Sequence, residues 1–333
     1  MPAASPAQAF DTIMQITSGH SVARSLHVVA ELGVADALDD SPRTSAELAK
    51  KTGTNPEALG RVLRLLASFG IFEVQDGRIS HTLASRLLRT DHPQSMRSFV
   101  RMIGLPVTWD AYGKLDHSLK TGQPSVPNVY PGGIWKYFEE NTDASRIFDQ
   151  AMAAKAQGQI PFIVKSYDFS KFGRIADIAG GQGHLLQAIL AANPKVKGVL
   201  FDLPHVIEKV SGAASERLQL QSGDFFKDKL PVCDAYLMMD IIHDWNDENS
   251  AKILKNLRRA TPANAKLLLI EAIIPDDSKP NPAKVLDVHM LVFAGGRQRT
   301  QQEHAEMLAA AGFRFEREID VGGSFSILEA VAV

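Results

Sequence analysis

Two kinds of hydrophobic spacing divide the chain near residue 167. Before that point, apolar residues recur every three or four positions, as on one face of an α-helix. After it, short apolar runs rich in Val, Ile and Leu alternate with helical stretches. The second pattern is typical of an α/β fold with a doubly wound, mostly parallel sheet. We therefore predict a mainly helical N-terminal region followed by an α/β domain.

The N-terminal pattern predicts three helices and a hairpin. A long helix is expected over 7–37, a shorter one from Thr44, and a third from Asn55-Pro56. Thr44 and Glu47 have the spacing of a capping box, and Asn55 before Pro56 is a typical helix start. Asp76-Gly77 then separates two short apolar stretches, which favours a β-hairpin. Helix, turn, helix and hairpin together indicate a winged-helix fold.

A winged helix can bind DNA or can serve assembly. Arg61 and Arg64 share their helix with Glu57, and Lys50-Lys51 is an isolated basic pair. This is too little positive charge for a phosphate-binding surface. The helix expected over 7–37 carries apolar residues on both faces and needs a large partner surface. We favour a homodimer and predict no nucleic acid partner; a DNA-binding regulator is the alternative.

The remaining helical pattern leads into the α/β part. Further helix is expected over 93–121, a loop rich in Pro and Gly over 121–133, and a long helix over 141–166. We divide the chain into a winged-helix dimerisation domain, a helical linker with the substrate-pocket region, and a cofactor-binding catalytic domain. Their expected bounds are 1–100, 101–166 and 167–333.

The expected strands of the α/β domain end in residues suited to ligand binding. Strands are predicted over 174–179, 196–201, 218–221, 235–239 and 266–270. In open α/β sheets, ligands bind beyond the carboxyl ends of the strands. The candidate cofactor-binding residues at these ends are Asp177, Gly180, Gly181, Gly183, Asp202, Leu203, Gly223, Asp224, Phe225, Met239 and Asp240.

The glycine cluster after the first strand indicates a nucleotide-type cofactor, because glycine lets the backbone approach a ligand closely. A dinucleotide fingerprint would need a small residue at position 186, which is Leu186. Asp177 suits a cationic ligand, and Asp202 can bind both hydroxyls of a ribose. Adenosine with a positive charge and no pyrophosphate describes S-adenosylmethionine (SAM). A structural turn with a solvated aspartate is the alternative.

Other residues at these ends suggest how the site works. Asp224 could accept from an adenine amino group with Phe225 stacked on the ring, or it could simply form an Asx turn. His243 and Glu271 should lie at the ends of neighbouring strands. The carboxylate could orient the imidazole and leave its other nitrogen free as a general base.

Composition narrows the function classes. The chain has 333 residues, 45% of them hydrophobic, and a net charge of −2, which gives no electrostatic case for nucleic acid or an anionic membrane. A single cysteine, Cys233, fits a reducing cytoplasm, and no apolar run approaches the length of a membrane span. The histidines are scattered and the cysteine is alone, so we predict no metal site.

Taken in order, the glycine turn, Asp202-Leu203-Pro204, Gly223-Asp224-Phe225-Phe226 and His243-Asp244-Trp245 resemble the small-molecule SAM-dependent O-methyltransferases. That family includes plant caffeic acid and bacterial antibiotic and phenazine O-methyltransferases. The resemblance covers nearly the whole chain. It implies a class I methyltransferase fold, an intertwined homodimer built by the winged-helix domain, and methyl transfer to a hydroxyl of an aromatic secondary metabolite.

The resemblance also assigns roles to residues. It implies that His243 is the catalytic base, Glu271 its orienting acid, and Asp202 and Asp224 the cofactor carboxylates. It also raises Phe148 and Met152 as substrate-facing residues. Apart from the resemblance, Asp244, His289, Met290 and Phe293 are further substrate-binding candidates, and Met290 and Phe293 could equally be plain core.

Three positions depart from the family pattern. Ala179 replaces the first glycine of the glycine-rich motif, and Met239 stands where the plant enzymes carry lysine. Gln298 stands where a second catalytic acid usually precedes the Arg-Thr pair, which leaves Glu271 as the expected orienting acid. The alternatives are a relative that keeps SAM but decarboxylates or hydroxylates, and a SAM-binding winged-helix regulator.

Overall fold

The structure is a computed structural model that describes residues 5–322 and 325–333. The chain forms two compact units. One takes in the residues up to Trp109 together with Phe138–Lys155, and the other takes in Asp110–Tyr137 and Ala156–Val333. The three-part division expected from the sequence remains a prediction.

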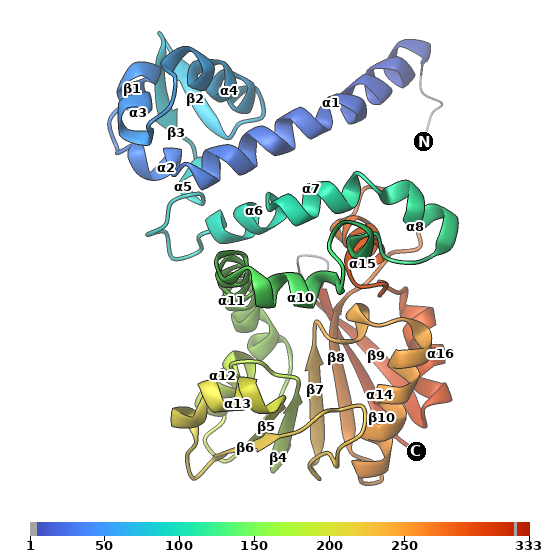
Figure 1. The fold of residues 1–333 in the computed structure, drawn as a ribbon. Coiled ribbons are helices and arrows are strands. Elements are labelled where there is room, and N and C mark those ends of the chain that lie inside the picture. The colour runs from blue at the N-terminus through green and yellow to red at the C-terminus, as the bar shows by residue number, and fades with distance from the viewer. Residues whose placement is uncertain (1–4, 323–324) are drawn as a thin grey trace. The chain divides into compact units, whose positions relative to one another are not determined.

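The first unit has the predicted order of helix, turn, helix and hairpin (Figure 1). Thr44 and Glu47 form the capping box, with the Thr44 side chain accepting from the Glu47 N–H and the Glu47 side chain accepting from the Thr44 N–H. Asp76 and Gly77 both have positive φ, as a tight hairpin turn requires. Its elements are α1 (Pro6–Glu31), α2 (Val34–Ala37), β1 (Arg43–Thr44), α3 (Ser45–Thr52), α4 (Pro56–Ser68), β2 (Phe72–Gln75), β3 (Arg78–His81), α5 (Leu83–Arg86) and α6 (Arg97–Ile103).

Two of the predicted helices are broken. The helix expected over 7–37 ends at Glu31, because Gly33 takes a left-handed φ of 65° and α2 begins afresh at Val34. The helix expected over 93–121 is three short helices, α6, α7 (Pro106–Tyr112) and α8 (Leu115–Thr121). Pro106 has no backbone N–H to continue α6, so the chain restarts there.

The second unit is built on a seven-stranded sheet of order β6-β5-β4-β7-β8-β10-β9. All neighbours from β6 to β8 are parallel, and β10 pairs antiparallel with both β8 and β9. The strands are β4 (Arg174–Ile178), β5 (Lys197–Asp202), β6 (Leu218–Ser222), β7 (Ala235–Met239), β8 (Lys266–Ala272), β9 (Phe313–Gly322) and β10 (Phe325–Ala332).

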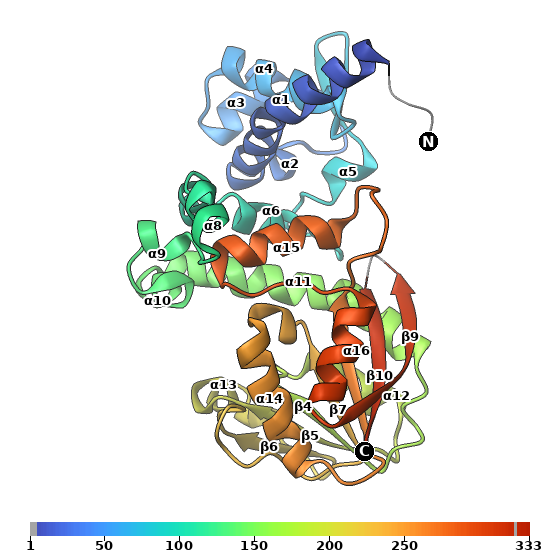
Figure 2. The ribbon, with the colours of Figure 1, turned by 90° about the vertical axis from the view of Figure 1, so that its right-hand side faces the viewer.

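Helices cover both faces of this sheet, and Figures 1 and 2 show α12 and α13 on one side with α14 and α16 on the other. Alternate residues of each strand enter two separate cores: Leu268 and Ile270 face one, and Leu267 and Leu269 face the other. The helices not yet named are α9 (Val126–Val129), α10 (Gly133–Glu140), α11 (Thr142–Ser166), α12 (His184–Ala192), α13 (Pro204–Lys209), α14 (Asp247–Ala260), α15 (Pro282–Phe293) and α16 (Gln301–Ala310).

The strand order reverses between β4 and β7, so the connections leaving these two strands run to opposite sides. Such a switch point opens a crevice at the carboxyl ends of the strands, which is where ligands bind in folds of this type. The predicted glycine turn follows β4 and the predicted histidine follows β7. The topology therefore brings the two candidate sites to one edge of the sheet.

Candidate active site

The glycine turn lies between β4 and α12 and is tightly folded. Ala179, Gly181 and Gly183 all have positive φ, between 57° and 73°. A Cβ at Gly180 would lie 2.5 Å from the Asp177 carboxyl carbon and 2.6 Å from Leu200. Glycine at 180 is therefore required by space, and Ala179 adopts a conformation that costs an alanine about 1–2 kcal/mol.

Asp202, at the end of β5, braces this turn. Its Oδ2 accepts the Gly181 N–H at 2.8 Å, and its Oδ1 accepts the Leu203 N–H at 2.7 Å. Burial raises the pKa of Asp202, and the two N–H groups oppose that rise. The carboxylate is thus fixed beside the glycines, where a ribose would need it.

Asp177 is a buried acid with no positive partner among the charges that shift it. Burial first, and then the charge of Asp202, raise the pKa of Asp177 to about 7. A cationic ligand at this turn would relieve both effects by favouring the ionised carboxyl. The environment of Asp177 therefore suits positive charge, and its contact with the cofactor stays a prediction.

The loop after β6 lies at the same carboxyl-end edge of the sheet, next to the end of β5. The Gly223 N–H donates to the Asp202 carbonyl at 2.9 Å, and Asp224 Oδ1 accepts the Phe226 N–H at 2.9 Å. Asp224 therefore forms the Asx turn that was its alternative interpretation, so a role toward adenine stays a prediction. The Phe225 ring stands edge-on to Trp245 at 6.0 Å.

His243 lies on a short 3₁₀ turn, Ile242–Asp244, just beyond β7. Its Nδ1 is 2.8 Å from Oε2 of Glu271, which lies on the neighbouring strand β8 and is fully buried. The distance is that of an ion pair, although the ring N–H is not aligned as in a regular hydrogen bond. Glu271 Oε1 accepts the Ile241 and Ile242 N–H groups at 3.2 and 2.9 Å, so the carboxylate cannot turn away.

Two further carboxylates flank the imidazole. Asp240 Oδ1 is 3.8 Å from Nδ1, and Asp244 Oδ1 is 3.4 Å from Nε2. Burial alone would lower the pKa of His243, but the charges of Glu271, Asp244 and Asp240 outweigh it and raise the pKa to about 9. The His243 charge in turn helps to lower the pKa of Glu271 against the effect of burial.

Among the described residues, Asp240, His243 and Glu271 also offer ligand atoms within 4.8 Å of one another, a spacing that a metal ion could use. Their contacts are explained by charge pairing within the cluster. The absence of a metal remains a prediction.

The predicted substrate-binding residues divide between the two units. His289 stacks on Phe293 at 4.1 Å, and its Nδ1 is 3.4 Å from the Tyr112 hydroxyl. Burial lowers the pKa of His289 to about 4, so this ring is neutral at pH 7. Met290 is buried on the same helix. Tyr112 was not a candidate, since nothing in the sequence links it to a residue 177 positions away.

Phe148 and Met152 lie on α11 within the first unit, where the Phe148 ring packs on Phe138 at 4.7 Å. Their predicted contact with substrate stays a prediction. Gln298 is buried in the second unit, and neither polar atom of its side chain has a hydrogen-bond partner within residues 5–322 and 325–333.

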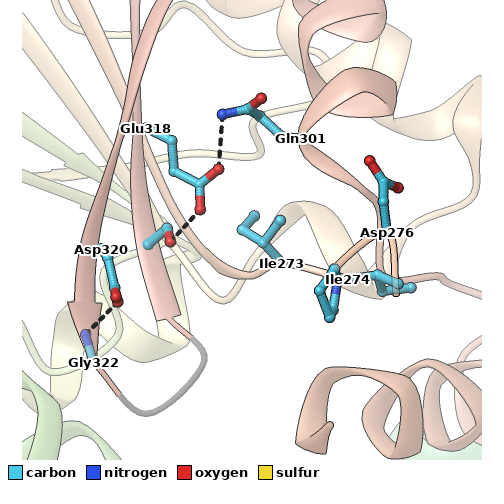
Figure 3. Close-up of a pocket in the computed structure, with 9 residues that line it drawn as sticks. Ile273, Ile274, Asp276, Gln301, Glu318, Asp320 and Gly322 are labelled. Atoms are coloured by element: carbon cyan, nitrogen blue, oxygen red, sulfur yellow. Dashed lines mark hydrogen bonds between the residues drawn. The ribbon is translucent and has the colours of Figure 1, made fainter. Parts of the chain in front are cut away.

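A hollow of about 430 Å³ lies elsewhere on the second unit (Figure 3). Glu318 points into it and accepts from Gln301 and from Ser326. The hollow is lined by Ile273, Ile274, Pro275, Asp276, Gln301, Glu318, Asp320, Gly322 and Ser326. None of these is a predicted site residue. The lining of the hollow therefore shares no residue with the predicted site, although Ile273 lies two residues beyond Glu271.

A mostly parallel sheet with a glycine turn after β4, an acid at the end of β5 and a histidine beyond β7 defines a class I methyltransferase. The sequence matches the O-methyltransferase domain over residues 112–314 and the O-methyltransferase dimerisation domain over residues 14–91. The chain belongs to the O-methyltransferase family that carries this dimerisation domain. The predicted family, fold class and type of enzyme are confirmed.

Relatives match over almost their full lengths. Phenazine O-methyltransferase PhzM of Lysobacter antibioticus is 37% identical, covering 96% of this chain and 95% of the relative. O-demethylpuromycin-O-methyltransferase of Streptomyces alboniger is 36% identical, and the match covers 97% of this chain and 89% of the relative. A similar solved structure is the crystal structure of CalO1, a methyltransferase in calicheamicin biosynthesis, in its S-adenosylhomocysteine (SAH)-bound form. The two structures have a TM-score of 0.90 at 30% sequence identity, and the match covers 99% of this chain and 100% of CalO1. The predicted cofactor, SAM, is confirmed for this family.

No helix within the described residues has the length and apolar character needed to cross a membrane.

Proposed function

We propose that this protein transfers a methyl group from SAM to a phenol-type hydroxyl of an aromatic secondary metabolite, with His243 as general base and Glu271 as its orienting acid. The observation that carries the proposal is the 2.8 Å approach of His243 Nδ1 to a carboxylate that is itself held by two backbone N–H groups. Nothing in a purely structural role requires a buried imidazole and a fixed carboxylate at a ligand-binding edge.

This arrangement prepares one nitrogen for proton transfer. Because Glu271 faces Nδ1, it favours the tautomer with the proton on Nδ1 and leaves Nε2 as the basic atom. A pKa of about 9 brings the imidazole within about one unit of a phenol, which ionises near 10. The proton transfer then costs about 1 kcal/mol, compared with about 5 kcal/mol for an unperturbed histidine.

The cofactor would be held by residues of the glycine turn and the ends of β5 and β6. Asp202 would bind the ribose hydroxyls, the turn would let adenosine approach the backbone, and Asp177 would complement positive charge. When bound, SAM supplies an electrophilic methyl group. The contribution of the chain is to bring the acceptor oxygen into line with that methyl and to take its proton at Nε2.

The acceptor is proposed to be a planar aromatic molecule. His289 and Phe293 form a stacked pair beside Tyr112, and the neutral imidazole adds no charge to it. Flat rings of this kind suit aromatic ligands. The two relatives described above are named for a phenazine and for O-demethylpuromycin, which supports an acceptor of similar class.

We also propose that the protein is a homodimer that uses α1. Phe10, Ile13, Met14 and Ile16 of this helix are between 49% and 72% exposed, although each is apolar. An apolar surface of this kind normally faces a partner. The match to the family dimerisation domain over residues 14–91 supports a second copy of this chain rather than nucleic acid.

The function is tested by incubating the purified protein with SAM and a panel of phenols, hydroxyindoles and hydroxyphenazines. We expect SAH to form together with a product 14 mass units heavier, since a methyl replaces a proton. A product that has lost CO₂ or gained oxygen would favour the decarboxylase or hydroxylase alternative. Binding of the protein to random DNA at physiological salt would instead favour a regulator.

A further inference from the structure

We propose that Arg299 is a positioning residue for His243. Its guanidinium fixes the turn that carries the imidazole, and its backbone fixes the end of the strand that carries Glu271. The inference rests on the proposed role of His243 as the base, and it adds a residue that acts through His243 without touching the reacting atoms.

The guanidinium binds the chain on both sides of His243. It donates to the Ile242 carbonyl at 3.3 Å and to the Trp245 carbonyl at 3.1 Å. It also donates to Asp247 Oδ1 at 2.8 and 3.1 Å, to Ser250 Oγ at 3.2 Å and to the Arg297 carbonyl at 3.3 Å. One side chain therefore holds the residue before the histidine, a residue after it, and the start of α14.

The backbone around Arg299 completes the connection. The Arg299 carbonyl accepts the Ile274 N–H at 3.1 Å, three residues beyond Glu271 on the same chain. The Arg297 N–H donates to the His243 carbonyl at 2.9 Å. A Cβ at Gly296 would lie 2.1 Å from that carbonyl, so this segment is pressed against the turn. The segment 296–299 thus links the turn of His243 to the strand of Glu271.

The turn needs this outside support because it makes few hydrogen bonds of its own. Only two bonds between its own backbone groups span it, from Asp244 N–H to Ile241 and from Trp245 N–H to Ile242, both at 3.2 Å. Asp240, at its start, has a left-handed φ of 55°, which is strained for a residue other than glycine. Neutral contacts also hold the turn from outside: Ser250 Oγ donates to the Ile242 and Trp245 carbonyls at 3.4 and 3.2 Å, and the Arg297 N–H donates to the His243 carbonyl. Arg299 adds the charged donor to these contacts, and we infer that without it the turn moves enough to carry the ring of His243 away from Glu271.

Arginine is the residue type that this position demands. The Arg299 side chain is only 2% exposed, and burying a charge is costly unless good hydrogen bonds satisfy it. The planar fork of a guanidinium spreads five N–H donors over three nitrogens, so it can bind carbonyl oxygens on both sides of the turn and a carboxylate, whereas the ammonium of lysine offers three donors from one atom. A methionine would fill the space but would leave carbonyls of the turn without their charged donor.

The test compares Arg299→Met and Arg299→Lys with Arg258→Met as a matched control. Arg258 is also on the second unit and donates to three carbonyls, those of Thr261, Gly312 and Val333, at the far end of α14. Each purified protein is measured for thermal stability, SAH affinity, kcat and the pKa of His243. The pKa is read by NMR on histidine labelled with ¹³C in the ring, and a His243→Asn variant assigns the signal.

If Arg299 positions His243, Arg299→Met lowers kcat about 100-fold per folded molecule while SAH affinity changes less than about twofold. The pKa of His243 falls from about 9 toward 6.5, because Glu271 on β8 no longer lies against the ring. Removing a positive charge would by itself raise that pKa, so a fall separates geometry from charge. The other acids near the ring, Asp240 and Asp244, move with the turn. Arg299→Lys should fall between, and Arg258→Met should lose stability but keep kcat and the pKa.

An unchanged kcat and an unchanged pKa of His243 in Arg299→Met would overturn the proposal, as would equal losses in Arg258→Met. If Arg299→Met does not fold, Arg299→Lys decides by the same two readouts. The proposed function is tested separately: were His243→Ala to keep full turnover, the base assignment would fail, while the pKa of His243 would still show whether Arg299 positions the ring.

Discussion

Replacing Glu271 by Gln perturbs the base without removing it. Gln keeps an oxygen that can accept the Ile241 and Ile242 N–H groups, as Glu271 Oε1 does at 3.2 and 2.9 Å. Its amide NH₂ group must then face His243 Nδ1, in place of the carboxylate oxygen at 2.8 Å. A donor at that position favours the tautomer with the proton on Nε2, and Nε2 can then no longer act as a base.

The size of the effect follows from charge and tautomer together. Carboxylates lift the pKa of His243 from 6.5 to about 9, and the Glu271 charge is the largest of the raising causes. The whole shift corresponds to about 3 kcal/mol between the two protonation states. Loss of a well-placed general base typically costs between about 10² and 10⁴ in rate, so we expect kcat to fall in that range. With the pKa lowered, the residual activity should lose its dependence on pH between about 7 and 9.

The pKa of His243 also sets how the activity of the unaltered protein depends on pH. A histidine with a pKa of about 9 holds its proton at pH 7, so only about one imidazole in a hundred is free to act as a base. Activity of the unaltered protein should therefore rise with pH toward about 9. When SAM binds, its positive charge near the ring lowers the pKa of His243, so the rise in activity moves to lower pH in the complex with SAM and acceptor.

The assay is a pH profile of kcat and of kcat/KM for the acceptor, with SAH affinity measured by calorimetry. Glu329→Gln is the matched control, because Glu329 is also a buried acid of the sheet but pairs with Tyr167 and Arg317. It should lose stability and keep the pH profile. If Glu271→Gln kept both its kcat and its pH profile, the reasoning about charge and tautomer would be refuted.

Three further outcomes are expected. SAM affinity should increase as pH rises through about 7, where Asp177 ionises. Calorimetry of SAM binding in buffers of different ionisation enthalpy should show proton release that Asp177→Asn abolishes; equal proton exchange in both proteins would contradict this. Gly180→Ala should lose about 1–3 kcal/mol of stability, because its Cβ would meet Asp177 and Leu200. Gly158→Ala, which has open space around the added Cβ, should lose none. Equal melting temperatures of the two variants would argue against the described packing of the turn. The double variant Ile13→Gln and Ile16→Gln should shift sedimentation toward the monomer, and an unchanged dimer would exclude the exposed face of α1 as the interface.

Local pattern predicted most of the secondary structure. The bounds of β4 to β8 lie within about two residues of the strands predicted at 174–179, 196–201, 218–221, 235–239 and 266–270. Apart from β6 at the edge, these strands are buried on both faces of the sheet, so each of them is a nearly continuous apolar run in the sequence. The capping box at Thr44 and the hairpin at Asp76-Gly77 were equally local. These signals need only neighbouring residues, so the sequence displays them directly.

The end of α1 shows what local pattern cannot predict. Gly19 and Gly33 both lie in the stretch expected as one helix, yet only Gly33 ends it. The final carbonyls of α1, those of Ala30 and Glu31, accept from the guanidinium of Arg97 at 2.8 and 3.3 Å. That donor lies more than sixty residues away, so only the folded structure reveals which glycine terminates the helix.

For the candidate site, as for the secondary structure, the sequence could predict positions along the chain but not contacts between distant residues. The sequence could place the candidate residues at the strand ends because the topology of an open α/β sheet gathers such residues at one edge, while their roles stay predictions. The contact of Tyr112 with His289 and those of Arg299 with the carbonyls of Ile242 and Trp245 could not be predicted, since such contacts leave no spacing signal. The pKa of His243 was also out of reach, because it depends on three carboxylates that meet only in the fold.

The central claim, that His243 takes the proton of the acceptor, is tested most directly by the turnover of His243→Ala at saturating SAM and acceptor. We predict a loss of at least about 100-fold in kcat with SAH affinity unchanged within about twofold, because the imidazole acts on the acceptor and not on cofactor binding. Turnover within a few-fold of the unaltered protein would contradict the account.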